Sequence, residues 1–328
     1  MNWLEKKREL TRMAQEAILP LIESDYVLYG LPYYRNIGDI LIWNGELELL
    51  KKTGFSCVGV CGWNKYPDTP ARSGTTILIT GGGFWGDLWR DTWEYALKGI
   101  ANNRTNRIII LPQTIYYQDK ELMRRDADYL SRFPNLVICV RDNMSYKLAR
   151  DHFSNPVVLV PDMAFCVNEE GLIRHSLISP SKEVLYLRRS DKEFDHTFQG
   201  AIPPEADCHD WLSIEHEQPE ENMFKRIYPH VMRACRHLSP NRTDRLHHYL
   251  YGTLYRTAMT RIALRQLTQY REIYSTRLHV MILGMLLGRK IKFIDSRYGK
   301  LSTFYDTWLT DCDNVEPLIP TPTPGSCR

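Results

Sequence analysis

The stretch YSTRLHVMILGMLLGRKIKFIDSRYGK, residues 274–300, joins a polar Arg-Leu-His trio to a long apolar run. Ser275 and Thr276 are residue types that begin helices, and positions 280–287 are apolar almost throughout. A helix that is hydrophobic on all sides is buried inside a larger fold. The stretch therefore predicts a helix between layers, with Ser275 and Thr276 at its start.

Gly288 is expected to end that helix, residues 291–294 predict a short strand, and residues 295–297 predict a polar turn. Arg277 and His279 then lie at the helix N-terminus. Free N–H groups and the helix dipole favour a phosphate or a carboxylate there, and a fixed guanidinium adds a bidentate clamp. One interpretation is an anionic ligand, and the other is surface solvation or a local cap.

Strand patterns alternate with helix patterns over much of the remaining chain. The predicted strands are residues 26–30, 55–60, 76–80, 108–111, 136–140, 157–160 and 184–187, and two predicted helices are residues 2–22 and 40–51. Units of strand, loop and helix build parallel sheets, whose loops gather a ligand at the carboxyl ends of the strands. The expected fold class is α/β.

A chain of 328 residues can bury two ordinary cores, because a domain takes about 150 residues. A break at Gly171 separates the first group of strands from the next. We therefore expect an N-terminal domain, residues 1–170, and a C-terminal domain, residues 171–328. A charged insertion is expected near residues 191–268.

Residues 81–87, GGGFWGD, follow a predicted strand and match the G-x-G-x-x-G pattern of dinucleotide-binding proteins. That pattern belongs on the first strand of its domain and needs an acid about 20 residues later to bind the ribose. Here it follows the third strand, and residues 104–107, RTNR, contain no acid. No nicotinamide or flavin cofactor is expected. The glycines instead predict a backbone that approaches a ligand closely, with Asp87 at the mouth.

Arginines follow two predicted strands directly: Arg141 ends one strand, and Arg188 and Arg189 end another. The carboxyl ends of parallel strands form the ligand-binding edge of a sheet. These residues therefore predict an electropositive cleft. A structural pairing of Arg141 with Asp142 is the alternative.

The charge balance inverts within the C-terminal half. Residues 191–221 contain ten acids against Lys192 alone, with two consecutive prolines, which predicts a loop or a mobile flap. Residues 225–290 contain thirteen Lys and Arg against two acids. Such an excess is typical of a solvated helix face, or of a basic amphipathic surface that rests on anionic lipid. RNA binding is a weaker third interpretation, because no nucleic-acid-binding module is recognisable.

The formal net charge of +3 points to no particular partner. The eight cysteines contain no C-x-x-C pair and several lie in apolar runs, so we expect reduced, buried thiols and no metal site. No run reaches about 18 apolar residues, and charges at residues 6–9 interrupt any signal-peptide core. These patterns predict a cytoplasmic protein, with peripheral binding at the inner face of the membrane as a further expectation.

Seven short motifs, in order, resemble the polysaccharide pyruvyl transferase family. They are Asn36-Ile37-Gly38-Asp39, Gly81-Gly82-Gly83 with Gly86-Asp87, Leu111-Pro112-Gln113-Thr114, Arg141-Asp142 with Ser145, Asp162, Arg277-Leu278-His279 and Tyr298-Gly299-Lys300. The resemblance implies two Rossmann-like domains in a GT-B-like arrangement with a cleft between them. Thr276 departs from the pattern, because relatives often carry an acid before the Arg-Leu-His trio.

The resemblance also implies an activity, in which the enolpyruvyl group of phosphoenolpyruvate moves to sugar hydroxyls of a glycan precursor and forms a ketal. The acceptor is either lipid-linked or free, phosphoenolpyruvate is a co-substrate, and no further cofactor or nucleic acid is implied. Arg141, His279 and Lys300 match important positions, and His279 is the expected general acid because imidazoles titrate near neutrality. The expected substrate-binding residues are Arg277 with Arg188 or Arg189, Leu278, Asn36, Asp39, Gly82, Gly83 and Asp87.

The resemblance implies that the second half binds the donor and that the glycine loops of the first half face the acceptor. Asp39 and Asp87 are candidate acceptor bases, and a helix-capping role is the alternative for each. A nucleotide-sugar-dependent GT-B glycosyltransferase is the second functional hypothesis. A non-catalytic scaffold docked on a membrane is the third.

Overall fold

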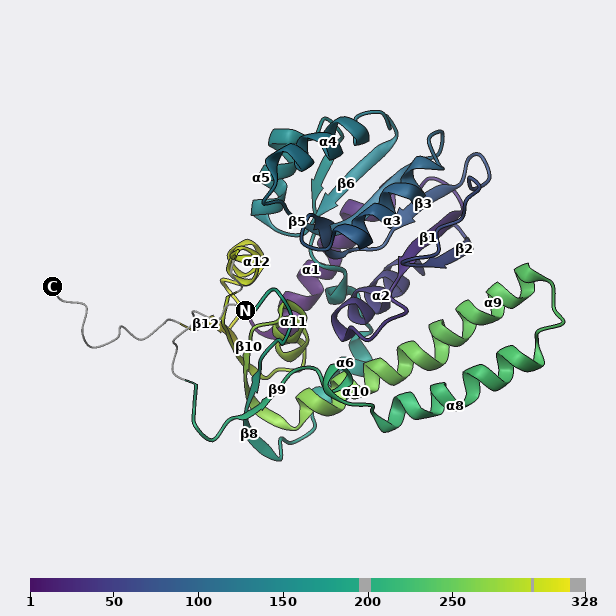
Figure 1. Ribbon diagram of the computed structural model, residues 1–328. Helices are drawn as coiled ribbons and strands as arrows, with labels where there is room; N and C mark the ends of the chain where they lie inside the picture. The colour runs from purple at the N-terminus through teal and green to yellow at the C-terminus, as the bar shows by residue number, and fades with distance from the viewer. Residues whose placement is uncertain (195–201, 296–297, 319–328) are drawn as a thin grey trace.

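Two parallel sheets organise the part of the chain that the structure, a computed structural model, describes: residues 1–194, 202–295 and 298–318 (Figure 1). The first sheet contains, in spatial order, β2 (Cys57–Gly62), β1 (Tyr26–Leu31), β3 (Thr76–Ile79), β5 (Ile108–Tyr116), β6 (Leu136–Val140) and β7 (Val157–Leu159), and β4 (Gly82–Gly86) pairs with β5. The second contains β12 (Val315–Pro317), β11 (Lys290–Phe293), β10 (Tyr270–Ser275), β8 (Lys182–Leu187) and β9 (Asp207–His209). These parallel sheets confirm the predicted α/β class.

Helices connect and cover the strands. The first group is α1 (Trp3–Ile18), α2 (Ile37–Leu50), α3 (Arg90–Ala101), α4 (Lys120–Leu130), α5 (Asn143–His152), the 3-10 helix η2 (Met163–Cys166) and α6 (Glu169–Ser176). The second group is α7 (Leu212–Glu215), α8 (Pro219–Ala234), α9 (Pro240–Leu250), the π-helical segment η3 (Tyr251–Tyr255), α10 (Arg256–Thr268), α11 (Leu278–Leu286) and α12 (Lys300–Trp308). Within the described residues, no helix is both long and apolar enough to cross a membrane.

In each sheet the strand order reverses at the first strand: β1 lies between β2 and β3, and β8 lies between β9 and β10. The loops that leave the carboxyl ends of the two strands at such a switch point diverge and open a crevice. The loops after β1, β3, β8 and β10 are therefore the places where this fold favours a ligand.

A single hydrophobic cluster spans both sheets. In β5, Ile109 and Leu111 belong to this cluster, whereas Ile108 and Ile110 belong to a second cluster on the other face of the first sheet. Alternate residues of a strand point to opposite faces, so the sheet is covered on both sides. The shared cluster also contains strand residues of the second sheet and nearly all of α11. The predicted burial of this helix between layers is confirmed.

The N-terminal helix α1 is tied to the C-terminal end of the fold. The Lys6 ammonium lies 2.7 Å from Asp311, and the terminal amine of Met1 lies 2.8 Å from Asp313. These contacts link the two predicted domains, whose division at residues 170 and 171 falls inside α6. That division stays a prediction.

Several predicted element boundaries are wrong. Ser275 and Thr276 do not start the helix, because β10 runs to Ser275, which lies opposite Leu187 of β8, and the hydroxyl of Thr276 accepts a hydrogen bond from the N–H of Arg189. Sheet pairing thus overrides the local preference for a helix cap. The helix starts at Leu278 with Arg277 as its N-cap.

The glycine segment does not enter a helix directly, since residues 82–86 pair with β5 as β4 and α3 starts only at Arg90. The predicted strand at residues 55–60 lies two residues further on, as β2. Two predicted buried thiols, Cys57 and Cys208, are exposed, and Cys327 lies outside the described residues. So do residues 296–297 of the predicted polar turn and residues 195–201 of the predicted flap.

Candidate active site

A cavity of about 340 Å³ is lined by residues of β4 and of the segments that follow β1, β2, β4, β6, β8, β9, β10 and β11. The lining contains nine of the predicted site residues: Asn36, Asp39, Gly83, Arg141, Arg189, Arg277, Leu278, His279 and Lys300. Its volume falls in the range of about 300 to 1,000 Å³ usual for small-ligand pockets. The fold therefore collects these residues from positions up to 264 residues apart into one pocket, since the first is residue 36 and the last is residue 300.

Two helix N-termini meet at His279. The side chain of Asn36 caps α2 by accepting a hydrogen bond from the N–H of Gly38, 2.9 Å away. A Cβ atom at Gly38 would lie only 2.4 Å from Nδ1 of His279, so glycine is needed for the imidazole to approach the helix. The motif Asn36-Ile37-Gly38-Asp39 thus begins α2 and makes room for the imidazole.

Asp162 fixes the surroundings of this imidazole. Its Oδ2 lies 2.6 Å from Nη1 of Arg141 and 3.5 Å from Nε2 of His279, and both Asp162 and Arg141 are fully buried. Burial by itself would raise the pKa of Asp162, but the charges of Arg141 and His279 outweigh burial and hold this pKa well below its usual range. Asp162 is therefore an anion at neutral pH, and its carboxylate can orient His279.

One guanidinium nitrogen of Arg141 forms no hydrogen bond with the residues that the structure describes. Its Nε donates to Thr114, its Nη1 pairs with Asp162, and its Nη2 is buried without a hydrogen-bond partner among the described residues. A Cβ atom at Gly83 would lie 3.0 Å from both this Nη2 and Nζ of Lys300. Gly83 thus lets two cations approach the backbone, and Nη2 is a donor that an anionic ligand could satisfy.

The other cations of the pocket are already paired with carboxylates. Arg277 binds Asp210 through Nε at 2.5 Å and Nη2 at 2.6 Å. Arg189 Nη1 lies 2.7 Å from Glu193 Oε2, and Lys300 Nζ lies 3.2 Å from the same oxygen. The positive charge of the predicted electropositive cleft is therefore largely neutralised by carboxylates of the protein itself.

Glu193 is the centre of this neutralisation. Its carboxylate also accepts hydrogen bonds from the indole of Trp89, at 3.0 Å, and from the hydroxyl of Tyr298. Burial would raise the pKa of Glu193, but Lys300 and Arg189 hold it well below its usual range. Burial lowers the pKa of Lys300, and the nearby Glu193 only partly opposes this.

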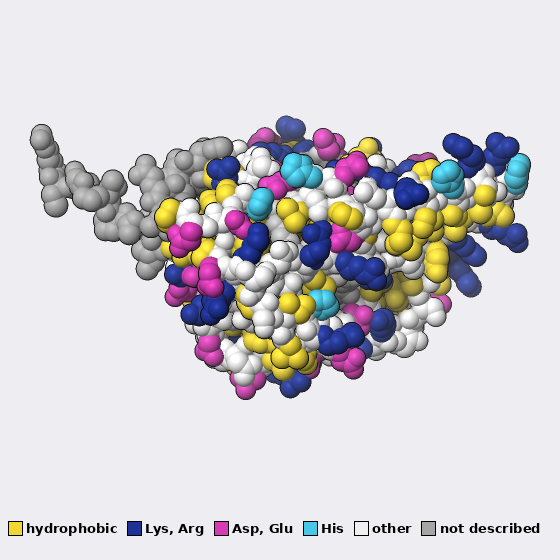
Figure 2. All heavy atoms as spheres, turned by 90° about the horizontal axis from the view of Figure 1, so that it is seen from below, with side chains coloured by type: hydrophobic (Ala, Val, Ile, Leu, Met, Phe, Trp, Pro, Cys, Tyr) yellow, Lys and Arg dark blue, Asp and Glu magenta, His cyan; other side chains and the backbone are white. Residues whose placement is uncertain are grey.

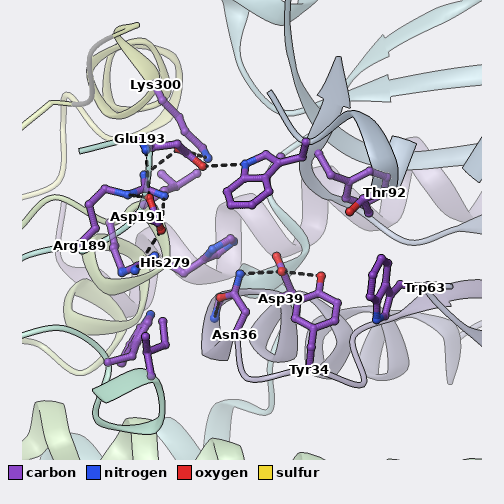
Figure 3. Close-up of a pocket in the computed structure, with 18 of the residues that line it drawn as sticks. Tyr34, Asn36, Asp39, Trp63, Thr92, Arg189, Asp191, Glu193, His279 and Lys300 are labelled. Carbon is purple, nitrogen blue, oxygen red and sulfur yellow. Dashed lines mark hydrogen bonds and ion pairs between the residues drawn. The ribbon is translucent and has the colours of Figure 1, made fainter. Parts of the chain in front are cut away.

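The side of the pocket that the first sheet supplies is aromatic and polar. Asp39 accepts hydrogen bonds from the hydroxyl of Tyr34 at 2.8 Å and from the amide of Asn36 at 2.7 Å. Figure 3 shows these residues with Trp63 and Thr92 on one side, opposite Arg189, Asp191, Glu193 and Lys300. Asp39 therefore faces the pocket instead of capping α2.

Three predicted residues do not line the pocket. Arg188 is exposed and lies over the ring of Phe194, whereas its neighbour Arg189 points inward. Asp87 accepts hydrogen bonds from the backbone N–H groups of Gln118 and Asp119, so it holds a loop. Gly82 lies beside the pocket residue Gly83 but is not part of the lining.

Sequence reasoning missed the counter-ions. Asp191 and Glu193 fall in the acidic segment that was interpreted only as a loop or flap, Asp210 was counted there without a role, and Asp162 carried a resemblance but no role. The strand sequence did contain one signal that could have separated the two arginines. Leu185, Leu187 and Arg189 are spaced by two residues, and residues at this spacing point to the same face of a strand. In β8 the residues Leu185 and Leu187 are buried, and the same spacing continued predicts Arg189, not Arg188, on the inner side.

Fold and pocket define an α/β protein with a charged pocket between two parallel sheets. A family model described as polysaccharide pyruvyl transferase matches residues 36–291, and the chain belongs to this family. Family membership and the names of relatives indicate a transferase with a role in pyruvyl transfer and polysaccharide biosynthesis.

Two curated relatives match most of the chain. EpsO of Bacillus subtilis (strain 168), provisionally named a pyruvyl transferase, is 27% identical over 88% of this chain and 85% of its own. Pyruvyl transferase 1 of Schizosaccharomyces pombe is 25% identical over 89% of this chain and 72% of its own. A crystal structure of a functionally uncharacterised Klebsiella pneumoniae protein shares the fold, with a TM-score of 0.64, 17% identity, and coverage of 94% of this chain and 98% of that one.

Proposed function

We propose that the protein transfers the enolpyruvyl group of phosphoenolpyruvate to two hydroxyls of a glycan, forming a pyruvate ketal and releasing phosphate. The observation that carries this proposal is the buried Nη2 of Arg141, which has no hydrogen-bond partner in the part of the chain that the structure describes and lies in the pocket that also contains Lys300 and His279. Phosphoenolpyruvate carries a phosphate and a carboxylate, and guanidinium groups suit both anions. We infer that the donor binds at Arg141 and takes over cations that Glu193 now neutralises.

In the proposed reaction, His279 protonates the methylene carbon of the donor, which leaves a cationic C2. One sugar hydroxyl attacks C2, the bond from C2 to the phosphate oxygen breaks, and a second hydroxyl closes the ketal. The two hydroxyl protons are accounted for by the new methyl group and the released hydrogen phosphate. Lys300 would neutralise the leaving phosphate, and Asp39 would take up a hydroxyl proton.

The acceptor would bind against the aromatic side. Aromatic rings with polar edges, such as Tyr34 and Trp63, suit the apolar faces and hydroxyls of a sugar ring. Such a division resembles a GT-B-like arrangement of two Rossmann-like domains, with the donor and the acceptor meeting in a cleft. The acceptor class proposed is a glycan precursor of a cell-surface polysaccharide, and the proposed place of action is the cytoplasm.

Calorimetry with phosphoenolpyruvate tests the donor. Arg141→Lys keeps the charge but removes Nη2, and the loss of one charge-assisted hydrogen bond of about 1.5 to 3 kcal/mol should weaken binding about 10- to 100-fold. Arg188→Lys, at the exposed arginine outside the pocket, is the matched control. Melting curves without ligand should be cooperative for both variants. Equal affinity in both variants, or binding of a nucleotide-sugar in place of phosphoenolpyruvate, would reject the proposal.

A further inference from the structure

The helical hairpin of α8 and α9 projects from the two sheets as an arm (Figure 1). The first helix of the arm leaves the body at Pro219, and the second returns through η3 into α10. A helix pair that extends beyond the core has an outer surface that the remainder of the fold does not cover. The residues on that surface are therefore informative about a partner.

The base of the arm is fixed to the loop after β1. The ring of Tyr33 stacks on Tyr251 with centroids 4.3 Å apart, and Arg35 binds the buried carboxylate of Glu221 with contacts of 2.8 and 3.1 Å. The residue between these two anchors, Tyr34, lines the pocket. The arm is thus held at a defined orientation relative to the pocket.

Large hydrophobic side chains are exposed along the arm. Met223 and Ile227 are 46% and 37% exposed, and at a spacing of four residues they lie on one face of α8. Leu238, in the turn after α8, is 37% exposed, and Tyr249 on α9 is 65% exposed. Exposed large apolar side chains that gather on one projecting element indicate an interaction surface.

Cations flank these side chains. The exposed Lys and Arg between residues 222 and 250 are Lys225, Arg226, Arg233, Arg236, Arg242 and Arg245, and Asp244 is the single acid of this segment in the sequence. Among the described residues, Lys225 alone of these six forms an ion pair, with Glu217. Figure 2, a view from below, shows hydrophobic side chains beside Lys, Arg and His on the arm, at the right.

We propose that the outer surface of the arm, residues 222–249, docks on an anionic lipid membrane. Apolar side chains would enter the boundary between headgroups and acyl chains, and the cations would contact lipid phosphates. Interfacial amphipathic helices bind membranes in this way. Each cation near an anionic bilayer contributes about 1 kcal/mol, so six together suffice for reversible docking. The surface combines the apolar and the cationic component that a lipid surface needs, and this favours lipid over an RNA or a protein partner. The proposal goes beyond pyruvyl transfer and rests on the arm alone.

Sedimentation with vesicles tests this docking without any substrate. The full chain should bind vesicles of phosphatidylcholine with about 30 mol% phosphatidylglycerol, and binding should fall about tenfold or more between about 0.05 and 0.5 M salt. Vesicles of phosphatidylcholine alone should bind far less. Phosphoenolpyruvate affinity, measured in parallel, should not change with the arm variants, so failure of docking and failure of the proposed function are distinguishable.

Matched variants locate the surface. Arg226→Glu with Arg233→Glu should weaken vesicle binding at least tenfold, whereas Arg124→Glu with Arg125→Glu makes the same charge change on α4, where both side chains are at least 70% exposed, and should stay within twofold. Ile227→Ser should weaken binding severalfold, and Leu177→Ser, at a 78% exposed leucine outside the arm, should not. Docking is rejected if neutral vesicles bind equally, if the α4 pair loses as much as the arm pair, or if no vesicles bind. A dimer that Ile227→Ser dissolves, without vesicle binding, would assign the surface to a second copy of the chain instead.

Discussion

The two sides of the pocket are built on different physical principles. On the side of the second sheet, Arg189, Arg277 and Lys300 are held by buried carboxylates in direct contact. On the side of the first sheet, the rings of Tyr34 and Trp63 line the cavity and few charges are present. The cations on the side of the second sheet can exchange one anion for another. The side of the first sheet offers flat aromatic surfaces and groups that bind hydroxyls. This difference matches an anionic donor and a sugar acceptor, as proposed above.

Arg141 and Asp162 complicate this comparison in an instructive way. Both residues follow strands of the first sheet, yet they lie against His279 of the second half. The acid proposed for catalysis is therefore oriented by the half that supplies the acceptor side. An arrangement of this kind makes the chemistry depend on the correct contact between both halves.

The largest expected effect is on turnover. His279→Asn keeps a hydrogen-bonding side chain but removes the proton donor, so phosphate release should fall about 10²- to 10⁴-fold, the usual contribution of a general acid. Donor affinity from calorimetry should stay within a few-fold, since Arg141 remains. Near wild-type turnover would show that another group supplies the proton, and Lys300 would be the next residue to test.

Asp39→Asn supplies the matched comparison from the acceptor side. The amide can still accept hydrogen bonds from Tyr34, so the geometry is preserved while the proposed base is lost. Donor affinity should not change, and acceptor-dependent phosphate release should fall. If Asp39→Asn instead weakens phosphoenolpyruvate binding, the division between a donor side and an acceptor side is wrong.

A smaller effect should follow from the removal of the internal anion. In Glu193→Gln the amide can still accept from Trp89, but it no longer neutralises Arg189 and Lys300. Phosphoenolpyruvate should then bind about tenfold more tightly, because it no longer competes with a carboxylate. The ligand-free protein should lose about 1 to 3 kcal/mol of unfolding free energy, and saturating donor should restore it.

Glu183→Gln is the control for this substitution, because Glu183 is 71% exposed and pairs with Arg271 at the surface. It should change neither the donor affinity nor the melting temperature measurably. Unchanged affinity in a folded Glu193→Gln protein would mean that the donor does not use these cations.

The difference between the two sides also explains what the sequence could predict. Strand and helix patterns depend on local periodicity, and they predicted the parallel α/β class and the three arginines that line the pocket, Arg141, Arg189 and Arg277. Asp191 and Glu193 pair with the nearby Arg189, but Asp191, Glu193 and Asp210 also pair with Arg277 or Lys300, which lie 67 to 107 positions away, and no local pattern records those contacts. Arg188 was retained as a candidate because the alternation of side chains along the strand was not used to decide which of Arg188 and Arg189 points inward. The start of α11 was misplaced because pairing between β8 and β10 extends the strand through Ser275.

The smallest expected effect leaves activity intact and concerns Glu46, a buried carboxylate that has no cationic partner within the described ranges. Among the described residues, Glu46 accepts hydrogen bonds only from neutral groups, the hydroxyl of Thr80 and the N–H of Gly81 at the start of the glycine segment. Burial raises the pKa of Glu46 to about 8, although these hydrogen bonds oppose the shift. Asp162 and Glu193 are also buried, but the cations beside them lower their pKa values. The partner, and not burial alone, therefore decides the direction.

The two kinds of carboxylate predict opposite pH dependence. The folded protein holds the Glu46 proton up to about pH 8, whereas an unfolded chain releases it near its ordinary pKa of 4.5. Stability from this group is present at low pH and is lost as pH rises through this window, by at most about 1.4 kcal/mol per pH unit. Asp162 and Glu193 contribute stability above their ordinary range that is lost only as pH falls below it. Urea unfolding between pH 5 and pH 8 should therefore show Glu46→Gln gaining on wild type as pH rises, and Glu48→Gln on the same helix should not. Parallel pH profiles for wild type and Glu46→Gln would mean that Glu46 is ionised inside the fold.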